Sequence, residues 1–398
     1  MTSSSNQDDE TIKSGTMLVE ARSGPSLTCI KVLKPPEKIL SGIRYSTNSK
    51  AWDCTFSRDG TWLAACYGAP DTCIRIWKQT DDASWVLNAT LEGVQTRTIR
   101  SLSFAPTRAP ILASASFDGT IAVWEYADKI WECTAQLEGH DNEVKCCRWN
   151  STGSLLATSG RDKTVWLWEC FLPGTIGGPD LQSNDATGGD FDCLAVLNGH
   201  EGDVKCVEFA PSHGQWGDGD EILLSGAYDD TIKVWAEDAG DWYCAASLSA
   251  HSSTVWSLAI SPGGSRLISG SADCSLGIFK CYTNKEKKSL FPEADRGING
   301  LWKCVGKLPN AHSAAIYSVS YAPSRAGHGR IASSGGDNCI HIYREAMGSS
   351  SDQPLFSIDA IVSTDHGDVN RVCWHPFDGS ILASAGDDGM VRLWRYRM

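Results

Sequence analysis

Sixteen cysteines are the residues of this 398-residue chain that first suggest chemistry, because thiolates bind metal ions and metal clusters. Such sites need short, regular cysteine spacings, and the chain contains no Cys-x-x-Cys pair. Its only adjacent cysteines, Cys146 and Cys147, cannot easily bind one metal ion together. We therefore expect reduced thiols that are buried and pack in the core, with no metal site and no cofactor.

Histidines and aspartates, which are the usual groups of acid–base catalysis, recur at regular distances along the chain. An aspartate stands six residues before each of seven aromatic residues, and a hydroxyl group stands ten residues before six of them. The aspartates are Asp71, Asp118, Asp162, Asp229, Asp273, Asp337 and Asp388, and the hydroxyl residues are Ser114, Thr158, Ser225, Ser269, Ser333 and Ser384. Histidines precede five of these sets: His140, His200, His251, His312 and His366. The regular spacing indicates a repeat.

The elements that must position these groups are short strands. The seven segments TCIRIW, GTIAVW, KTVWLW, DTIKVW, CSLGIF, NCIHIY and GMVRLW end at Trp77, Trp124, Trp168, Trp235, Phe279, Tyr343 and Trp394. The shortest interval between these aromatic residues is 44 residues, which is the length of one four-stranded propeller blade. Sixteen tryptophans and 38 glycines also favour many short strands joined by tight turns. The sequence therefore predicts seven similar units.

From about Ser26 to Trp394 the chain resembles the WD-repeat family, which implies an all-β fold, a seven-bladed β-propeller. The last unit lacks an outer strand, and the N-terminal segment SLTCIKVL, residues 26–33, can close the ring by supplying it. In this family one histidine, hydroxyl, aspartate and tryptophan form a hydrogen-bonded tetrad within each blade. The resemblance places His140, Thr158, Asp162 and Trp168 in one tetrad, and His200, Ser225, Asp229 and Trp235 in the next. These residues are therefore interpreted as structural, not catalytic.

The domain organisation follows from composition. We expect a disordered polar tail at residues 1–24 and a propeller at residues 25–398, with loop insertions at about 171–190 and 285–300. The tail lacks the features of a secretory signal, and no run of about 20 apolar residues is present, so we expect no membrane partner. The formal net charge of −13 argues against direct nucleic-acid binding.

Enzyme motifs are missing from the sequence. It contains no phosphate-binding loop with a following Lys-Ser/Thr and no Gly-x-Ser-x-Gly elbow. The GDGDE segment at Gly217 lacks the spacing of a calcium loop. We therefore expect a protein that is not an enzyme.

Two positions in each unit are predicted to lie on one face of the disc. One follows the apolar residue that opens the first strand, and the other precedes the repeated aspartate. Together they include four basic and five aromatic residues: Arg100, Lys145, Lys205, Arg161, Trp52, Trp256, Tyr317, Tyr228 and Phe117. Arginine and aromatic side chains are typical anchors of interfaces. We interpret this face as a protein-binding site for short acidic peptides.

A narrower resemblance appears in EGHDNEVKCCRW, LATSGRDKTVWLWE and HGDVNRVCWHP, which are similar to the WD-repeat subunit of the cytosolic iron–sulfur protein assembly targeting complex. The resemblance implies a non-enzymatic adaptor, cytoplasmic and with the nucleus as a second location. Its implied partners are a small adaptor subunit, a HEAT-repeat scaffold and apo iron–sulfur client proteins. Arg161 falls on a surface arginine that the family uses for docking. Two alternatives stay open: a WD scaffold in a ubiquitin ligase or a chromatin complex, and a metal-binding protein that uses the thiols.

Overall fold

The computed structural model describes residues 24–36, 38–40, 43–45, 49–173, 189–211, 221–282, 286, 289–290, 301–323, 329–346 and 348–398. Nearly all of the expected tail at residues 1–24, and most of the expected insertions at 171–190 and 285–300, lie outside these residues. Within the described part of the chain, no helix combines the length and the apolar character needed to cross a membrane.

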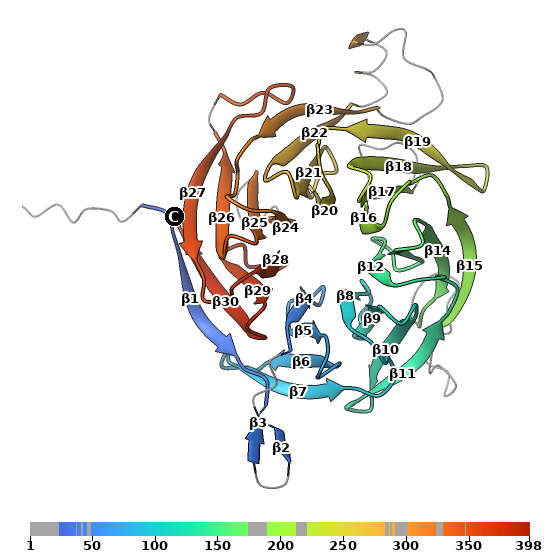
Figure 1. Ribbon diagram of the computed structural model, residues 1–398, viewed down its shortest axis with the longest axis vertical. Coiled ribbons are helices and arrows are strands. Elements are labelled where there is room, and N and C mark those ends of the chain that lie inside the picture. The colour runs from blue at the N-terminus through green and yellow to red at the C-terminus, as the bar shows by residue number, and fades with distance from the viewer. Residues whose placement is uncertain are drawn as a thin grey trace, which may run out of the picture.

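Seven four-stranded antiparallel sheets surround a central axis, each with its first strand near the axis and its last strand at the rim (Figure 1). The predicted seven-bladed, all-β propeller is thereby confirmed. The strands of blades 1 to 3 are β4 (Ala51–Phe56), β5 (Trp62–Tyr67), β6 (Ile74–Gln79), β7 (Trp85–Leu91), β8 (Ile99–Phe104), β9 (Ile111–Ser116), β10 (Ile121–Ala127), β11 (Ile130–Leu137), β12 (Val144–Trp149), β13 (Leu155–Gly160), β14 (Val165–Phe171) and β15 (Asp190–Leu197). Those of blades 4 to 7 are β16 (Val204–Phe209), β17 (Ile222–Ala227), β18 (Thr231–Asp238), β19 (Asp241–Ser249), β20 (Val255–Ile260), β21 (Arg266–Ser271), β22 (Leu276–Tyr282), β23 (Leu301–Leu308), β24 (Ile316–Tyr321), β25 (Arg330–Gly335), β26 (Cys339–Glu345), β27 (Phe356–Ser363), β28 (Val369–Trp374), β29 (Ile381–Gly386) and β30 (Val391–Arg397).

The N-terminal strand closes the ring, as the sequence predicts. Strand β1 (Ser26–Leu33) pairs antiparallel with β30 as the outer strand of blade 7, with Leu33 opposite Val391. Leu27 and Leu33 are buried by this pairing. A short hairpin of β2 (Lys38–Leu40) and β3 (Ile43–Tyr45), which the sequence does not predict, projects outside the ring (Figure 1).

The core lies between neighbouring blades, where the second strand of every blade is buried along its whole length. These strands consist of apolar and small residues, as in LLATSG of β13, because both of their faces are covered. Gly386 shows how tight this packing is, since a Cβ atom there would lie 2.6 Å from the side chain of His366. The blades therefore form a rigid support for the residues that face the axis.

Candidate protein-binding site

The residues most typical of acid–base catalysis form a continuous chain of hydrogen bonds inside blade 3. The indole N–H of Trp168 donates to Thr158 Oγ1 (3.0 Å), and the Thr158 hydroxyl lies 2.8 Å from His140 Nε2. On the other side of the ring, His140 Nδ1 lies 2.7 Å from the carboxylate of Asp162. Each buried polar group thus has a partner, and the histidine has no nitrogen left for a substrate.

Four further blades repeat this arrangement. The Nδ1–carboxylate and Nε2–hydroxyl distances are 2.8 and 2.7 Å for His200 with Asp229 and Ser225, 3.0 and 2.6 Å for His251 with Asp273 and Ser269, 2.9 and 2.7 Å for His312 with Asp337 and Ser333, and 2.7 and 2.7 Å for His366 with Asp388 and Ser384. The indole of Trp235 donates to Ser225 Oγ at 2.8 Å. His366 occupies its place although it stands one residue nearer to the following strand than the other histidines.

Blades 1 and 2 lack the histidine and use other side chains. In blade 2, Ser114 Oγ donates to Gln95 Oε1 (2.8 Å) and accepts from Trp124 Nε1 (3.0 Å). In blade 1, the buried guanidinium of Arg75 pairs with Asp71 and lies 4.2 Å from the ring centre of Tyr67. The same space between strands is therefore filled by whichever polar side chain reaches the aspartate or the hydroxyl.

The electrostatics of the tetrads favour an ionised aspartate and a neutral histidine. Burial alone would raise the pKa of Asp162, but hydrogen bonds from His140 and Thr164 outweigh it and lower that pKa. Burial lowers the pKa of His200 and His366 despite their aspartate partners. A neutral histidine with Nδ1 as donor and Nε2 as acceptor fits the observed chain of bonds.

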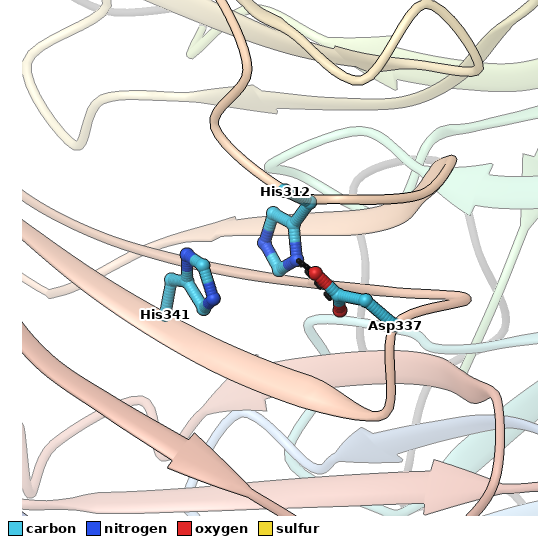
Figure 2. Close-up of side chains that lie close together, drawn as sticks. All are labelled: His312, Asp337 and His341. Carbon is cyan, nitrogen blue, oxygen red and sulfur yellow. Dashed lines mark hydrogen bonds and ion pairs between the residues drawn. The ribbon is translucent and has the colours of Figure 1, made fainter.

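One tetrad has the composition of a metal centre (Figure 2). His312, Asp337 and His341 place possible ligand atoms within 4.8 Å of one another. The two imidazole rings are stacked, however, with centres 3.9 Å apart and planes at 17°. Ring nitrogens bind metals in the plane of the ring, so two stacked rings cannot both direct a lone pair at one ion. His341 instead lies 3.1 Å from the Tyr343 hydroxyl, and the arrangement fits a tetrad extended by one histidine.

A β-bulge places one side chain of every inner strand at the axis. The pairing between the first and second strands skips one residue just after the strand begins, for example between Val144 and Cys146. The skipped residues are Trp52, Arg100, Lys145, Lys205, Trp256, Tyr317 and Asn370. A bulge breaks the alternation of a strand and re-aims the extra side chain. These are the seven positions after the opening apolar residue that the sequence singled out.

The re-aimed side chains line a central pocket of about 280 Å³. Seven of the nine residues predicted to bind protein belong to it: Trp52, Arg100, Phe117, Lys145, Lys205, Trp256 and Tyr317. The other two lie outside its lining. Tyr228 is 63% exposed, and the side chain of Arg161 is 55% exposed and 3.7 Å from Glu143. Both follow a second strand and so sit in turns on the face of the disc, beside the pocket.

The pocket's lysines are each held by a carboxylate and an aromatic ring. Lys145 pairs with Glu143 (2.5 Å) and lies 4.0 Å from the ring centre of Phe117. Lys205 pairs with Asp203 (3.0 Å) and lies 5.2 Å from the ring centre of Trp256. Burial lowers the pKa of Lys145, although Glu143 opposes this effect. The result is a half-buried cationic and aromatic wall.

Sequence reasoning missed two charged residues of the pocket, Lys50 and Asp368, whereas a third, Asp387, stands at the predicted position before the repeated Asp388 but was not named as a binding residue. Lys50 pairs with Asp387, and Asn370 Nδ2 donates to Asp387 Oδ1 at 3.0 Å. A signal was available for the two missed residues, because Lys50 and Asp368 stand two residues before the bulge residue, at the same place as Glu143 and Asp203 in other blades. Blade 7 thus adds an acidic side to the pocket.

The cysteines correct one expectation. All sixteen are free thiols, but Cys29, Cys193, Cys244 and Cys304 are exposed, so the expectation of buried thiols is wrong for them. They share a place on the outer strands opposite the terminal aromatic residue, as Cys193 lies opposite Trp168. The outer strand has no neighbour beyond it, so its outward side chains face solvent. Burial nevertheless raises the pKa of Cys29 and Cys193, which disfavours reactive thiolates.

Comparisons with known proteins agree with this architecture. The family described as WD domain, G-beta repeat matches residues 28–78, 85–125, 131–169, 191–236, 242–280, 302–344 and 360–395. A Candida dubliniensis protein named "Probable cytosolic iron-sulfur protein assembly protein 1" is 34% identical over 420 residues, covering 87% of this chain and 97% of the relative. A Chaetomium globosum protein of the same name is 32% identical over 318 residues, covering 67% of this chain and 66% of the relative.

A third relative, from Schizosaccharomyces pombe, is named a "Probable cytosolic Fe-S cluster assembly factor". It is 34% identical over 332 residues, which cover 82% of this chain and 49% of the relative. The chain therefore spans about half of the S. pombe relative and about two thirds of the Chaetomium one, but nearly all of the Candida protein. The repeat matches and the extent of these alignments show that the chain belongs to the WD-repeat family of cytosolic iron–sulfur protein assembly proteins.

Proposed function

We propose that this protein is a non-catalytic adaptor of cytosolic iron–sulfur protein assembly. It docks a small adaptor subunit, a HEAT-repeat scaffold and apo-protein clients, and so brings the clients to the proteins that insert the cluster. The names of its relatives support the process and the cytoplasmic location. We propose the nucleus as a second location. The iron–sulfur cluster is cargo here, not a resident cofactor.

The central pocket is the observation that carries the proposal. A chain with a formal net charge of −13 gathers Arg100, Lys145 and Lys205 with four aromatic residues at one end of its axis. Arg161 and Tyr228 extend this surface beyond the pocket. Exposed arginine and aromatic side chains on a rigid support are typical of protein-binding surfaces. We call the pocket together with Arg161 and Tyr228 the docking face.

The non-catalytic part of the proposal rests on the tetrads. Histidine, aspartate and hydroxyl groups that could do acid–base chemistry use their polar atoms on one another, as in blade 3. A catalytic base needs a free nitrogen or oxygen within reach of its substrate.

Charge reversal at Arg161 tests the docking face. The Arg161→Glu variant should bind the purified small adaptor subunit about 30-fold more weakly, because an interfacial ion pair lost is worth about 2 kcal/mol or more. Its thermal unfolding should match wild type, since a half-exposed ion pair at 3.7 Å contributes little to stability. Lys129→Glu, in the β10–β11 turn, is the matched charge-reversal control and should bind normally. Equal affinity of Arg161→Glu and wild type in calorimetric titrations at moderate salt would remove Arg161 from the docking face.

A further inference from the structure

Four of the six charged residues that line the central pocket form ion pairs. Lys50 pairs with Asp387, and the other two lysines pair with carboxylates just outside the pocket. Those carboxylates are Glu143 for Lys145 and Asp203 for Lys205. A paired lysine offers little net attraction to a ligand, so the pocket's selectivity must come from the groups that remain.

Two opposite charges remain without an ion pair among the described residues. Arg100, on β8 of blade 2, makes a long hydrogen bond of 3.5 Å to the backbone carbonyl of Trp52. Its guanidinium lies 5.3 Å from the centre of the Trp52 ring. The nearby carboxylate of Asp53 accepts instead from Leu102 N (2.9 Å) and pairs with Arg371 (3.1 Å). Burial lowers the pKa of Arg100, as expected for a desolvated cation whose counter-ion is engaged elsewhere.

The unpaired anion is Asp368, in blade 7. Burial and the neighbouring Asp387 raise its pKa, and Lys50 and the hydroxyl of Tyr317 only partly offset this. Lys50 forms its ion pair with Asp387, not with Asp368. Arg100 and Asp368 both line the pocket, but they lie on different blades and do not pair with each other. A half-buried charge without a counter-ion is costly, and a ligand of opposite charge relieves that cost.

An unused hydrogen-bond donor lies in the same lining. The indole N–H of Trp256 is buried and has no acceptor in the described part of the protein. Its ring packs edge-on against Tyr317, with centres 5.6 Å apart, so the indole is held in place. Buried indole donors usually have a partner, so this N–H is a further unsatisfied polar group in the lining of the pocket.

We propose that the central pocket binds a peptide segment that carries one acidic and one basic side chain, the carboxylate at Arg100 and the cation at Asp368. The proposal rests on the proposed function and specifies which segment of a partner protein enters the docking face. The aromatic side chains that line the pocket accommodate the aliphatic stems of the two side chains. A purely acidic peptide would satisfy Arg100 and leave Asp368 unpaired.

The size and surroundings of the pocket favour a peptide. A volume of about 280 Å³ holds side chains but no folded domain. The exposed Tyr228 and Arg161 continue the same face beyond the pocket, so a longer chain can leave it and keep contact. A free amino acid would use the pocket alone.

Short peptides capped at both ends test the proposal on the full-length protein. One series carries Glu and Lys separated by one to four glycines, and two control series replace Glu or Lys by Gln. In calorimetric titrations the best Glu/Lys peptide should bind wild type about tenfold more tightly than either control, as expected for a charge-assisted contact. This arm needs no variant, so misfolding cannot obscure it.

Variants then assign each charge. Arg100→Gln should lose the preference for Glu over Gln and keep the preference for Lys, and Asp368→Asn should show the reverse. Asp368→Glu should retain the Lys preference, and Lys129→Gln, outside the pocket, should retain both. A Glu/Lys peptide that binds no better than its controls, or a Glu preference that survives Arg100→Gln, overturns the proposal. Displacement of the peptide by free glutamate plus lysine at equal concentration overturns the peptide assignment.

The two proposals can fail separately. If Arg161→Glu impairs binding of the small adaptor subunit while the peptides show no dependence on charge, the docking face stands and the acidic–basic segment does not. If the peptides behave as expected while the adaptor binds Arg161→Glu normally, the pocket assignment stands and the docking of the adaptor at Arg161 does not.

Discussion

Removal of the Asp162 carboxylate should destabilise the propeller through one buried histidine. Its oxygens accept four hydrogen bonds: from His140 Nδ1 (2.7 Å), Asp141 N (3.2 Å), Thr164 N (3.1 Å) and Thr164 Oγ1 (2.7 Å). The carboxylate is 9% exposed, whereas the His140 side chain is fully buried. In Asp162→Ala, water can therefore reach the turn amides, but the imidazole N–H loses the carboxylate that accepts its hydrogen bond.

The cost can be worked out from these contacts. Each hydrogen bond contributes about 0.5–1.5 kcal/mol net, and a buried donor left unsatisfied costs about 1–3 kcal/mol. With partial replacement by water at the turn, the free energy of unfolding should fall by about 3 kcal/mol. The unfolding entropy of a chain of this length is about 0.8 kcal/mol per kelvin, so Tm should fall by about 4 °C.

Differential scanning fluorimetry measures this shift, and two variants calibrate it. Asp162→Asn keeps one oxygen that can accept a hydrogen bond from Thr164, but it no longer has two carboxylate oxygens for both His140 and Thr164. Its Tm should therefore fall by less than that of Asp162→Ala. Asp141→Ala removes the exposed neighbouring carboxylate and should shift Tm by less than about 1 °C. If Asp162→Ala and Asp141→Ala unfold at the same temperature, the blade 3 tetrad does not contribute the stability assigned to it.

Two further properties follow from the fold. Deletion of residues 1–33 should lower Tm markedly relative to deletion of residues 1–22, because only the longer deletion removes β1 and exposes the edge of blade 7; equal Tm values would contradict closure by this strand. Stability should also fall as the pH drops from 7 to 5. Burial lowers the pKa of His200, His251 and His366 from 6.5, so the unfolded chain binds more protons below about pH 6.5. Urea midpoints at constant 0.2 M salt measure this, and midpoints that stay flat or rise toward pH 5 would contradict neutral buried histidines.

The fold could be predicted almost completely from the sequence. Seven aspartates at a fixed distance from seven aromatic residues define the number of blades, and the apolar segment at residues 26–33 predicts the closing strand. This succeeds because the partners within a tetrad are close in sequence, as His140 and Asp162 are 22 residues apart. A repeated local pattern therefore encodes its own hydrogen bonds.

The pocket lining was only partly predictable. The positions of Arg100 and Lys205 follow from the repeat, but their convergence depends on a bulge at the start of each inner strand. A bulge leaves little trace in the residue pattern. Asp368 and Lys50 were missed because they precede the strands, where charged residues are common and usually solvated.

By itself, the sequence determined the propeller, its tetrads and which residue types stand at the start of each inner strand. Only the tertiary structure decided how the charges are used. Lys50 pairs with Asp387 across 337 residues, while Arg100 and Asp368, which line the same pocket, form no ion pair with any residue that the structure describes. Ion pairing depends on distance and burial, and both arise when seven strands from distant parts of the chain meet at one axis. The same closure of the ring leaves outer-strand thiols such as Cys193 in solvent, which no local pattern could reveal.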